Sequence, residues 1–364
     1  MERVYNFNPG PAALPLEVLE QAKEEMTEYA GAGMSLMEMS HRSKPVERMI
    51  EETEQLLAEL LGLPGGYRTL FMGGGASTQF ALIPLNFLTE DTQGQYVLTG
   101  SFAEKAYAEA KTIGETSVAA SGKITGWRQL PDLSDLHANI TPNAAYIHLT
   151  TNNTIEGTQL RELPDPGETP LIADMTSDIL SRKLDWTKVG MAYAGAQKNL
   201  GPAGVTVAIV RDDLLKRSED QRIPTIFKYA TFAANDSLYN TPPVHAIYVT
   251  KLVLEWTKRQ GGVEEMAQRA ALRAGMLYEA IDGSDGFYTG FADKSARSLM
   301  NVTWRLPDEA RERRFVEEAK CEGFEGLAGH RSVGGLRASI YNAVPVAAAE
   351  ALADFMREFR RRNG

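Results

Sequence analysis

The sequence has a single cysteine, Cys321, among its 364 residues. An internal disulfide is therefore impossible, and a reducing compartment is the simplest interpretation. Long apolar runs are absent too, since no stretch approaches the roughly 18 consecutive apolar residues of a membrane-spanning helix. The opening MERVYNFNPGPAALP has no basic region followed by an apolar run, so no signal peptide is predicted. We therefore expect a cytoplasmic protein that does not enter a membrane.

Positive charge is in short supply as well. The 38 lysines and arginines are outnumbered by 48 acidic residues, which leaves a net charge of −10. This balance argues against a nucleic-acid binder, which normally has a basic face. It does not argue against small anionic substrates, because distant charges are screened and a few local arginines can dominate a site. No His/Cys cluster has metal-ligand spacing and no GxSxG motif occurs, so neither a metal enzyme nor a serine hydrolase is expected.

Helical and strand patterns alternate over most of the chain. A helix is predicted to open at Pro15, with its apolar face extending to Ala30, and a clearer one covers 46–61 and ends at Gly62. Short apolar runs bounded by turn residues predict strands at 69–72, 96–99, 144–150, 171–173 and 205–210. Runs that are apolar at consecutive positions are typical of strands buried on both faces. The pattern predicts an α/β protein with a mostly parallel sheet flanked by helices.

The pattern changes near residue 262. Two long helical patterns are followed by few strands and further helices, at 242–259, 263–281, 299–304, 308–322, 337–341 and 345–361. Such a mixture predicts a smaller α+β domain at the C-terminus. We therefore expect a large cofactor-binding domain over 15–262 and a small domain over 263–364.

A glycine turn, Gly73–Gly75, follows the predicted strand 69–72 and opens a helix. Glycines allow a close backbone approach, and a helix start offers free N–H groups and the positive end of the dipole. With the hydroxyls of Ser77 and Thr78, the segment fits a phosphate group. It does not match GxGxxG and no acidic residue ends the next strand, so a dinucleotide is less expected than a single phosphate. A glycine turn used only for packing remains an alternative.

Two further polar residues follow predicted strands. Asp174 could hold a metal, a ribose or a protonated ring nitrogen, or could cap a helix. Lys198 lies among small residues between two apolar strands; a partly buried amine there would deprotonate readily and could form a Schiff base. A lysine extending from a strand end to solvent is the alternative. A phosphate site, a carboxylate and a lysine in this order form the set that pyridoxal phosphate requires.

Longer motifs carry a family resemblance. They are NFNPGPAALP, MSLMEMSHRS, GGGASTQF, NNTIEG, DMTSDILSR, AGAQKNLGPAGV, SLYNTPP and GHRSVGGLRASIYNAVP. Through these motifs essentially the whole chain resembles the phosphoserine aminotransferases, a family of class V pyridoxal-phosphate-dependent enzymes of fold type I. The resemblance implies a homodimer with shared active sites and an N-terminal arm, 1–14, at the site. It also implies reversible transamination of 3-phosphohydroxypyruvate with glutamate in serine biosynthesis, and allows phosphohydroxythreonine formation in pyridoxine biosynthesis.

The resemblance also implies roles for individual residues. Lys198 matches the Schiff-base lysine, Asp174 the partner of the pyridine nitrogen and Arg337 the clamp on the substrate α-carboxylate. The cofactor-binding set is completed by Ala76, Ser77, Phe102, Thr154 and Gln197, with Asn240 and Thr241 reaching the cofactor phosphate from the second subunit. The substrate's distal phosphate or carboxylate is assigned to His41, Arg42, His330 and Arg331. One position departs from the family pattern: Phe102 stands where tryptophan usually covers the cofactor ring, with less stacking area and no N–H.

Two His–Arg pairs, His41–Arg42 and His330–Arg331, also favour this activity on chemical grounds. Both substrates carry an α-carboxylate, and one of them ends in a phosphate, which arginine and histidine can bind. An alanine–glyoxylate type aminotransferase would not need two such pairs for a distal dianion. A cysteine desulfurase needs a nucleophilic cysteine on a mobile loop, a context that Cys321 lacks. A non-catalytic anion-binding α/β protein is the alternative from another class.

Overall fold

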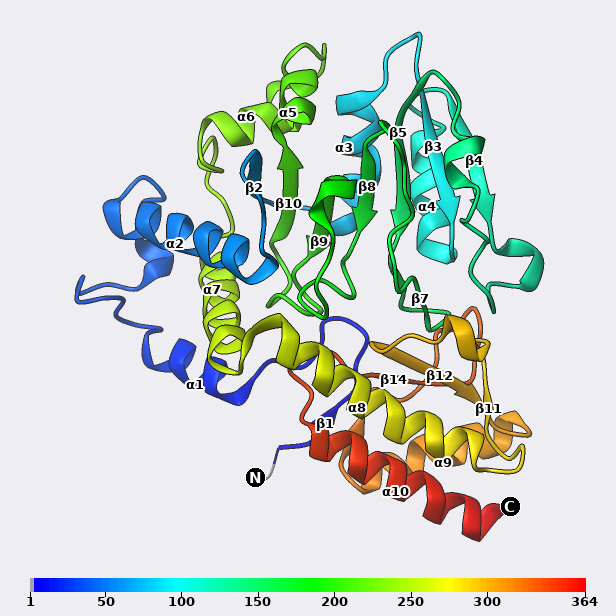
Figure 1. Ribbon diagram of the computed structural model, residues 1–364. Helices are drawn as coiled ribbons and strands as arrows, with labels where there is room; N and C mark the ends of the chain where they lie inside the picture. Colours follow the sequence, from blue (N-terminus) through cyan, green and yellow to red (C-terminus); the bar gives the residue numbers. More distant parts are fainter. Residues whose placement is uncertain (1–2) are drawn as a thin grey trace.

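The computed structural model describes residues 3–364, and a seven-stranded sheet forms its centre (Figure 1). The strands lie in the order β2-β10-β9-β8-β5-β3-β4. Their bounds are β2 Tyr67–Met72, β3 Gln93–Leu98, β4 Thr116–Ser121, β5 Ala144–Thr150, β8 Leu171–Asp174, β9 Val189–Gly195 and β10 Thr206–Arg211. Strand β10 is antiparallel to both of its neighbours, and the other pairs are parallel. The expected α/β fold with a mostly parallel sheet is confirmed.

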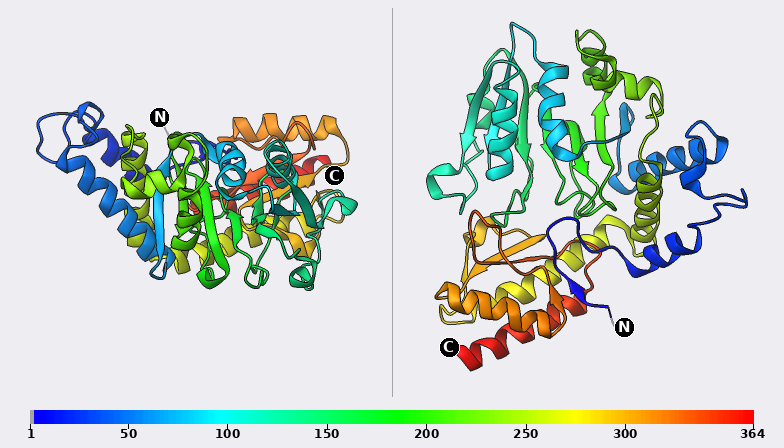
Figure 2. Two further views of the ribbon diagram at one scale, coloured as in Figure 1. Left: turned by 90° about the horizontal axis from the view of Figure 1, so that it is seen from above. Right: turned by 180° about the vertical axis from the view of Figure 1, so that it is seen from behind.

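Helices cover both faces of this sheet (Figures 1 and 2). One face packs against α1, α2 and α7, and the other against α3, α4, α5 and α6. Their bounds are α1 Leu16–Glu24, α2 Lys44–Leu61, α3 Gly75–Phe87, α4 Ser101–Ala110, α5 Asp212–Glu219, α6 Tyr229–Ala234 and α7 Val244–Arg259. The strands between them are apolar at consecutive positions because both faces are buried.

The predicted end of α2 is correct, whereas the predicted length of α1 is wrong. Gly62 ends α2 with a φ of 63°, a left-handed conformation that glycine adopts at little cost. The first helix ends at Glu24 and does not reach Ala30. Tyr29, whose position extends the helical period, is held instead by an edge-to-face contact with Tyr248 on α7, 5.4 Å between ring centroids. A tertiary contact therefore explains an apolar position that periodicity assigned to the helix.

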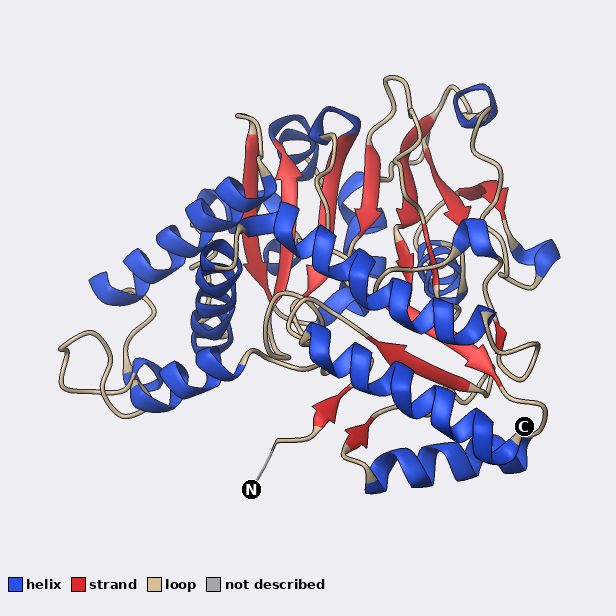
Figure 3. Cartoon of the chain, turned by 60° about the horizontal axis from the view of Figure 1, so that its bottom comes forward, coloured by secondary structure: helices blue, strands red, loops and turns tan. Residues whose placement is uncertain are grey.

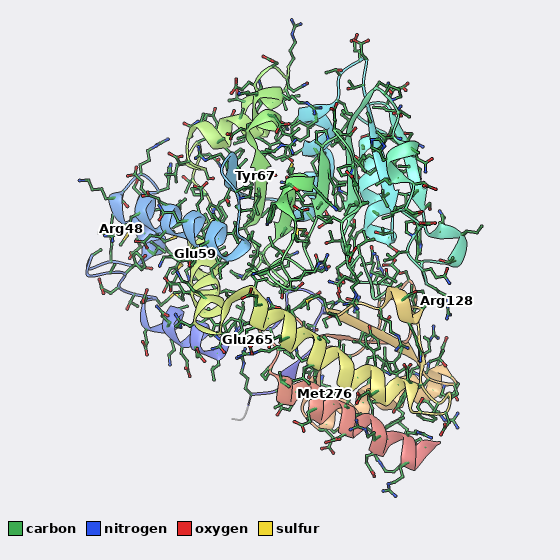
Figure 4. All side chains as sticks on the ribbon, viewed as in Figure 1. Arg48, Glu59, Tyr67, Arg128, Glu265 and Met276 are labelled. Carbon is green, nitrogen blue, oxygen red and sulfur yellow. The ribbon has the colours of Figure 1, made fainter. Side chains whose placement is uncertain are left out.

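The C-terminal part has its own apolar cluster and its own three-stranded sheet, β11-β12-β14 (Figure 3). Its elements are α8 Gly262–Asp282, β11 Thr289–Gly290, β12 Asn301–Arg305, α9 Glu309–Cys321, β13 Phe324–Glu325, β14 Leu336–Ser339 and α10 Val346–Asn363. The predicted boundary at 262 falls on the first residue of α8, shortly after α7 ends at Arg259. An ion pair joins the two parts of the chain on either side of this boundary. Arg128, which lies beside the C-terminal part (Figure 4), has its Nη2 3.4 Å from Asp293 Oδ1. Among residues 3–364, none of the helices has the combination of length and apolar character that a transmembrane span requires.

The N-terminal segment runs between the large sheet and the C-terminal part (Figure 2). Its strand β1, Tyr5–Asn6, pairs in parallel with β13. Farther along, the Tyr341 hydroxyl donates to the Pro9 carbonyl at 2.8 Å, and the Ala12 N–H donates to the Gln197 carbonyl at 2.9 Å. The segment is thus attached at one end to the C-terminal part and at the other to the residue that precedes Lys198. The remaining short strands, β6 Asn152–Asn153 and β7 Thr158–Gln159, pair with each other beside this junction.

Candidate active site

Asp174 is the last residue of β8 and is buried, with 4% of its surface exposed. Its Oδ1 accepts a hydrogen bond from the Thr176 backbone N–H at 3.0 Å. Burial raises the pKa of Asp174, while the hydrogen bonds from Thr176 and the charge of Lys198 oppose the rise. A nearby cation, such as a protonated ring nitrogen, would stabilise the charged form of this buried carboxylate.

Lys198 lies shortly after β9, in the turn that leads to β10. Its Nζ donates to Thr154 Oγ1 at 2.6 Å and lies 5.3 Å from the centre of the Phe102 ring. Desolvation lowers the pKa of Lys198 to about 8; Arg337 adds to this effect and Asp174 opposes it. A substantially larger fraction of the amine is therefore neutral at physiological pH than for an ordinary lysine, and a neutral amine is the form that attacks an aldehyde.

The glycine turn after β2 has the backbone conformation of a ligand cradle. Gly74 and Gly75 have φ values of 94° and 69°, and α3 begins at Gly75. A Cβ atom on Gly74 would lie 2.0 Å from Thr78 Oγ1, so no larger residue fits there. Ala76 and Ser77 occupy the first turn of α3, where backbone N–H groups lack partners within the helix. The N–H groups and the dipole of the helix favour a phosphate at this position.

Phe102 is held over Lys198 by a buried glutamate that sequence reasoning missed. Glu156 is fully buried, and its Oε1 accepts from the Ser101 N–H at 2.9 Å and from the Ser101 hydroxyl at 2.5 Å. These bonds fix the first turn of α4, which carries Phe102. Glu156 does not follow a predicted strand, and its only signal in the sequence is its place in the motif NNTIEG.

Arg337 lies on β14 with 5% of its surface exposed, and one of its nitrogens donates to the Thr154 carbonyl at 3.0 Å. Its Nε has no hydrogen-bond partner among the described residues. Burial lowers the pKa of Arg337, an effect that Tyr341 and Glu156 oppose. A buried guanidinium with free donors, anchored through the residue that also contacts Lys198, is suited to grip a carboxylate.

The loop before β14 places His330 and Arg331 near Arg337. The Ser332 N–H donates to His330 Nδ1 at 3.2 Å, and the Ser332 hydroxyl lies 2.6 Å from the same atom. Desolvation lowers the pKa of His330, and the charges of Arg337, Lys105 and Arg331 lower it further. Since Nδ1 accepts, the neutral ring carries its proton on Nε2. His330 can therefore donate a hydrogen bond to an anion from Nε2.

His41, Arg42, Asn240 and Thr241 gather at a different place. Thr241 Oγ1 lies 3.1 Å from His41 Nδ1. Asn240 and Thr241 also line a pocket of about 220 Å³ with Gly73 and Thr78 of the same chain. The structure thus brings His41 to Thr241, and Asn240 and Thr241 to the glycine turn and the first turn of α3 in the same chain.

The residues around Lys198 fit pyridoxal phosphate. The turn at Gly74 leaves no room for a side chain, Asp174 is a buried carboxylate at one end of the site, and the lysine amine lies beneath an aromatic ring. Gln197 adjoins the lysine, and Gly10 of the N-terminal segment lies against it, since a Cβ at Gly10 would be 3.4 Å from Lys198 Cγ. Together these groups offer a partner for each polar end of the cofactor.

The lowered pKa of Lys198 leads to a prediction for cofactor attachment. In the protein freed of cofactor, covalent attachment of pyridoxal phosphate is expected to accelerate as pH rises and to level off above pH 8 to 9. The rate rises with pH because only the neutral amine reacts, and only about a tenth of the lysine amine is neutral one pH unit below its pKa. Stopped-flow absorbance measures the rate, with Lys198→Ala as the control. A rate that climbs steadily to pH 10 would mean that the lysine has an ordinary pKa.

Known proteins match this chain over nearly its whole length. Residues 4–352 match the family model described as aminotransferase class-V. The phosphoserine aminotransferase of Geobacillus kaustophilus (strain HTA426) is 55% identical over 364 residues, covering 100% of this chain and 99% of that protein. The solved phosphoserine aminotransferase from Bacillus circulans subsp. alkalophilus is 53% identical, with a TM-score of 0.96 and full coverage of both chains.

A further solved phosphoserine aminotransferase, studied for radiation damage of its Schiff base, is 51% identical, with a TM-score of 0.97 and full coverage of both chains. The family model spans nearly the whole chain, and the identity to curated relatives extends over its full length. The chain therefore belongs to the class V aminotransferases, within the phosphoserine aminotransferase family.

Proposed function

We propose that the chain catalyses the reversible transamination of 3-phosphohydroxypyruvate with L-glutamate, yielding O-phospho-L-serine and 2-oxoglutarate. The observation that carries this proposal is the convergence of a depressed-pKa lysine, a buried carboxylate and a buried arginine at Lys198, Asp174 and Arg337. The relatives reported above are named phosphoserine aminotransferases, which supports the substrate. We place the reaction in serine biosynthesis in the cytoplasm, and the same site would accept a phosphorylated hydroxythreonine in pyridoxine biosynthesis.

When bound, pyridoxal phosphate supplies an aldehyde for the substrate amine and a ring that takes up the electrons of the broken Cα–H bond. Lys198 Nζ would hold the cofactor through its aldehyde and, once freed by the substrate amine, would act as the base that takes the substrate's α-proton and as the acid that gives it back. Asp174 would keep the cofactor's ring nitrogen protonated, and the Thr154 hydroxyl, which accepts from Lys198 Nζ, orients the amine. Phe102, whose ring lies 5.3 Å from Lys198 Nζ, would help to exclude water from the site.

Substrate recognition divides between the two ends of the amino acid. Arg337 grips the α-carboxylate that glutamate and phosphoserine share, because its planar fork offers two parallel donors. Arg331 and the Nε2–H of His330 meet the distal group, which is a carboxylate in one substrate and a phosphate in the other. Ala76, Ser77 and Gln197 hold the cofactor phosphate. Two substrates with different tails can therefore use one site in turn.

We also infer a homodimer with shared sites. Three apolar side chains near Asn240 and Thr241, namely Ile226, Phe227 and Tyr239, are exposed in the single chain, with 36–42% of their surfaces accessible. A partner subunit placed there would cover them and would receive Asn240 and Thr241 at its own cofactor phosphate. His41 and Arg42, which lie beside Thr241, would then reach the partner's substrate.

We further infer the division into an arm over 1–14, a cofactor-binding domain over 15–262 and a small domain over 263–364.

A half-reaction assay tests the activity. The purified protein, loaded with pyridoxal phosphate, is mixed with phosphoserine, glutamate or alanine, and conversion of the cofactor to its amino form is followed by absorbance. Rapid conversion by phosphoserine and glutamate and slow conversion by alanine are expected. Preference for alanine would indicate an alanine–glyoxylate type aminotransferase, and the absence of any conversion would indicate a binding protein.

Substitutions at the two arginines are expected to separate the ends of the substrate. Arg337→Lys keeps the charge but loses the fork, so phosphoserine and alanine should both lose roughly 1.5–3 kcal/mol of transition-state binding. Arg331→Ala should reduce the half-reaction with phosphoserine far more than that with alanine, which has no distal anion. The ratio of kcat/KM between the wild type and each variant, measured for each half-reaction, gives the loss of transition-state binding for that substrate. Equal losses for the two substrates at Arg331→Ala would refute this division of the pocket.

A further inference from the structure

The loop 329–335, here called the anion loop, carries His330 and Arg331 and is closed on itself. The Gly329 N–H donates to the Gly335 carbonyl at 2.9 Å, and the N–H groups of Val333 and Gly334 both donate to the His330 carbonyl, at 3.0 and 2.8 Å. A loop cross-linked in this way moves as one piece. The contacts at its base therefore decide where His330 and Arg331 point.

Arg305, at the end of β12, makes the side-chain contact at this base. Its Nη1 donates to the Val333 carbonyl at 2.8 Å. Gly335 lies so close that a Cβ would be 2.5 Å from Arg305 Cδ and 2.7 Å from the Trp304 carbonyl. Arg305 and Glu312 also line an open pocket of about 370 Å³ together with Gly329, Gly334 and Gly335 of the loop. The loop is thus in direct contact with the arginine, and a change in the arginine's position is expected to shift the loop.

Glu312, in the first turn of α9, fixes Arg305 in turn. Its Oε1 accepts from Arg305 Nε at 2.6 Å and from the Leu306 N–H at 3.2 Å. The Glu312 side chain is 9% exposed and that of Arg305 is 42% exposed. A half-exposed ion pair contributes little to stability. Its geometry is nevertheless well defined, because one carboxylate oxygen holds both the guanidinium and the backbone at the end of β12.

We propose that Arg305 and Glu312 are positioning residues for the distal anion of the substrate, acting through the anion loop. The proposal rests on the proposed role of His330 and Arg331 in binding that anion. The guanidinium is held on one side by Glu312 and donates on the other to the carbonyl of Val333. The pair thereby sets the distance between the donors of the loop and Arg337, which grips the other end of the substrate. That distance selects for the length of the substrate.

The test uses the protein loaded with pyridoxal phosphate and compares phosphoserine with alanine. In Arg305→Met and Glu312→Gln, the half-saturation concentration for phosphoserine is expected to rise roughly tenfold, as for one lost charged hydrogen bond, while the alanine half-reaction stays unchanged. Arg305→Lys, which can keep one of the two bonds, should give an intermediate effect. The matched control is Arg314→Met, which removes an exposed pair of the same 2.6 Å length on α9, with Glu318, and should change neither substrate.

A second background shows whether the effect passes through the anion loop. In the double variant His330→Ala/Arg331→Ala, adding Arg305→Met should cost phosphoserine nothing further, because the loop no longer offers donors to position. An equal loss for alanine and phosphoserine in Arg305→Met, or a full additional loss in the double background, would overturn the proposal. If the double variant loses activity equally with phosphoserine and with alanine, the proposed distal pocket is wrong, and that outcome is recognised without Arg305.

Discussion

Replacing Lys198 by alanine is expected to abolish transamination and leave the fold intact. One amine serves as both the anchor of the cofactor and the carrier of the α-proton, so its loss removes the acid–base catalyst and the covalent attachment together. General acid–base catalysis alone accounts for a factor of roughly 10² to 10⁴ in rate. The side chain lies in a site rather than in the apolar core, which makes the substitution tolerable for folding.

Two measurements check this expectation. Steady-state assays with glutamate and 3-phosphohydroxypyruvate measure turnover, and mass spectrometry after borohydride treatment measures covalent cofactor. The wild type should gain the mass of one reduced cofactor per chain, and Lys198→Ala should gain none. Circular dichroism and thermal unfolding serve as controls for the fold. A variant that is still labelled, or that retains more than a trace of turnover, would show that another amine holds the cofactor.

Mixing two inactive variants, Lys198→Ala and Arg42→Ala, is expected to restore activity if the sites are shared across a two-fold axis. Each subunit then lends Arg42 to the site that contains its partner's Lys198. In a mixed dimer one site carries both defects and the other carries neither. Random pairing makes half of the dimers mixed, so roughly a quarter of wild-type activity should return.

The experiment requires joint unfolding and refolding of the two variants, followed by the standard assay. Each variant refolded alone provides the background, and native mass spectrometry establishes the fraction of mixed dimers. If mixed dimers form and no activity returns, every site carries one defect, which places Arg42 in the same subunit's site as its own Lys198. The structure gives the experiment its motive, because His41, the neighbour of Arg42, contacts Thr241, which we infer to serve the partner's site.

The sheet could be predicted well because its strands are buried on both faces. The run 144–150 coincides with β5, and the predicted strand at 205–210 differs from β10 by a single residue at each end. Periodicity gives no direction, however, and the antiparallel placement of β10 between β2 and β9 had no sequence signal. Strand β4 was not predicted either, since every residue in it is partly or fully exposed and the apolar run is weak.

Lys198, Asp174 and the glycine turn could be proposed from the sequence because each lies at or shortly after the end of a strand, where ligands of parallel sheets bind. Buried residues that contact one another across the strands next to Asp174 could not be found in this way. Tyr193, on β9, is the register partner of Asp174 on β8. The Tyr193 hydroxyl lies 2.8 Å from Nε2 of His148 on β5, the other neighbour of β8. Only the pairing of strands brings these three together, and no spacing along the chain predicts it.

The contact between the N-terminal segment and β13 has a consequence for the order in which the site is completed during synthesis. Every residue assigned here to the cofactor lies before position 242, yet Gly10, which rests against Lys198, belongs to a segment whose strand pairs with Phe324 and Glu325. A nascent chain that has not reached these residues has the lysine and the carboxylate, and only the hydrogen bond from Ala12 to Gln197 is available to hold the segment across them. The segment that covers the lysine is therefore anchored at both ends only after nearly the whole polypeptide has been made.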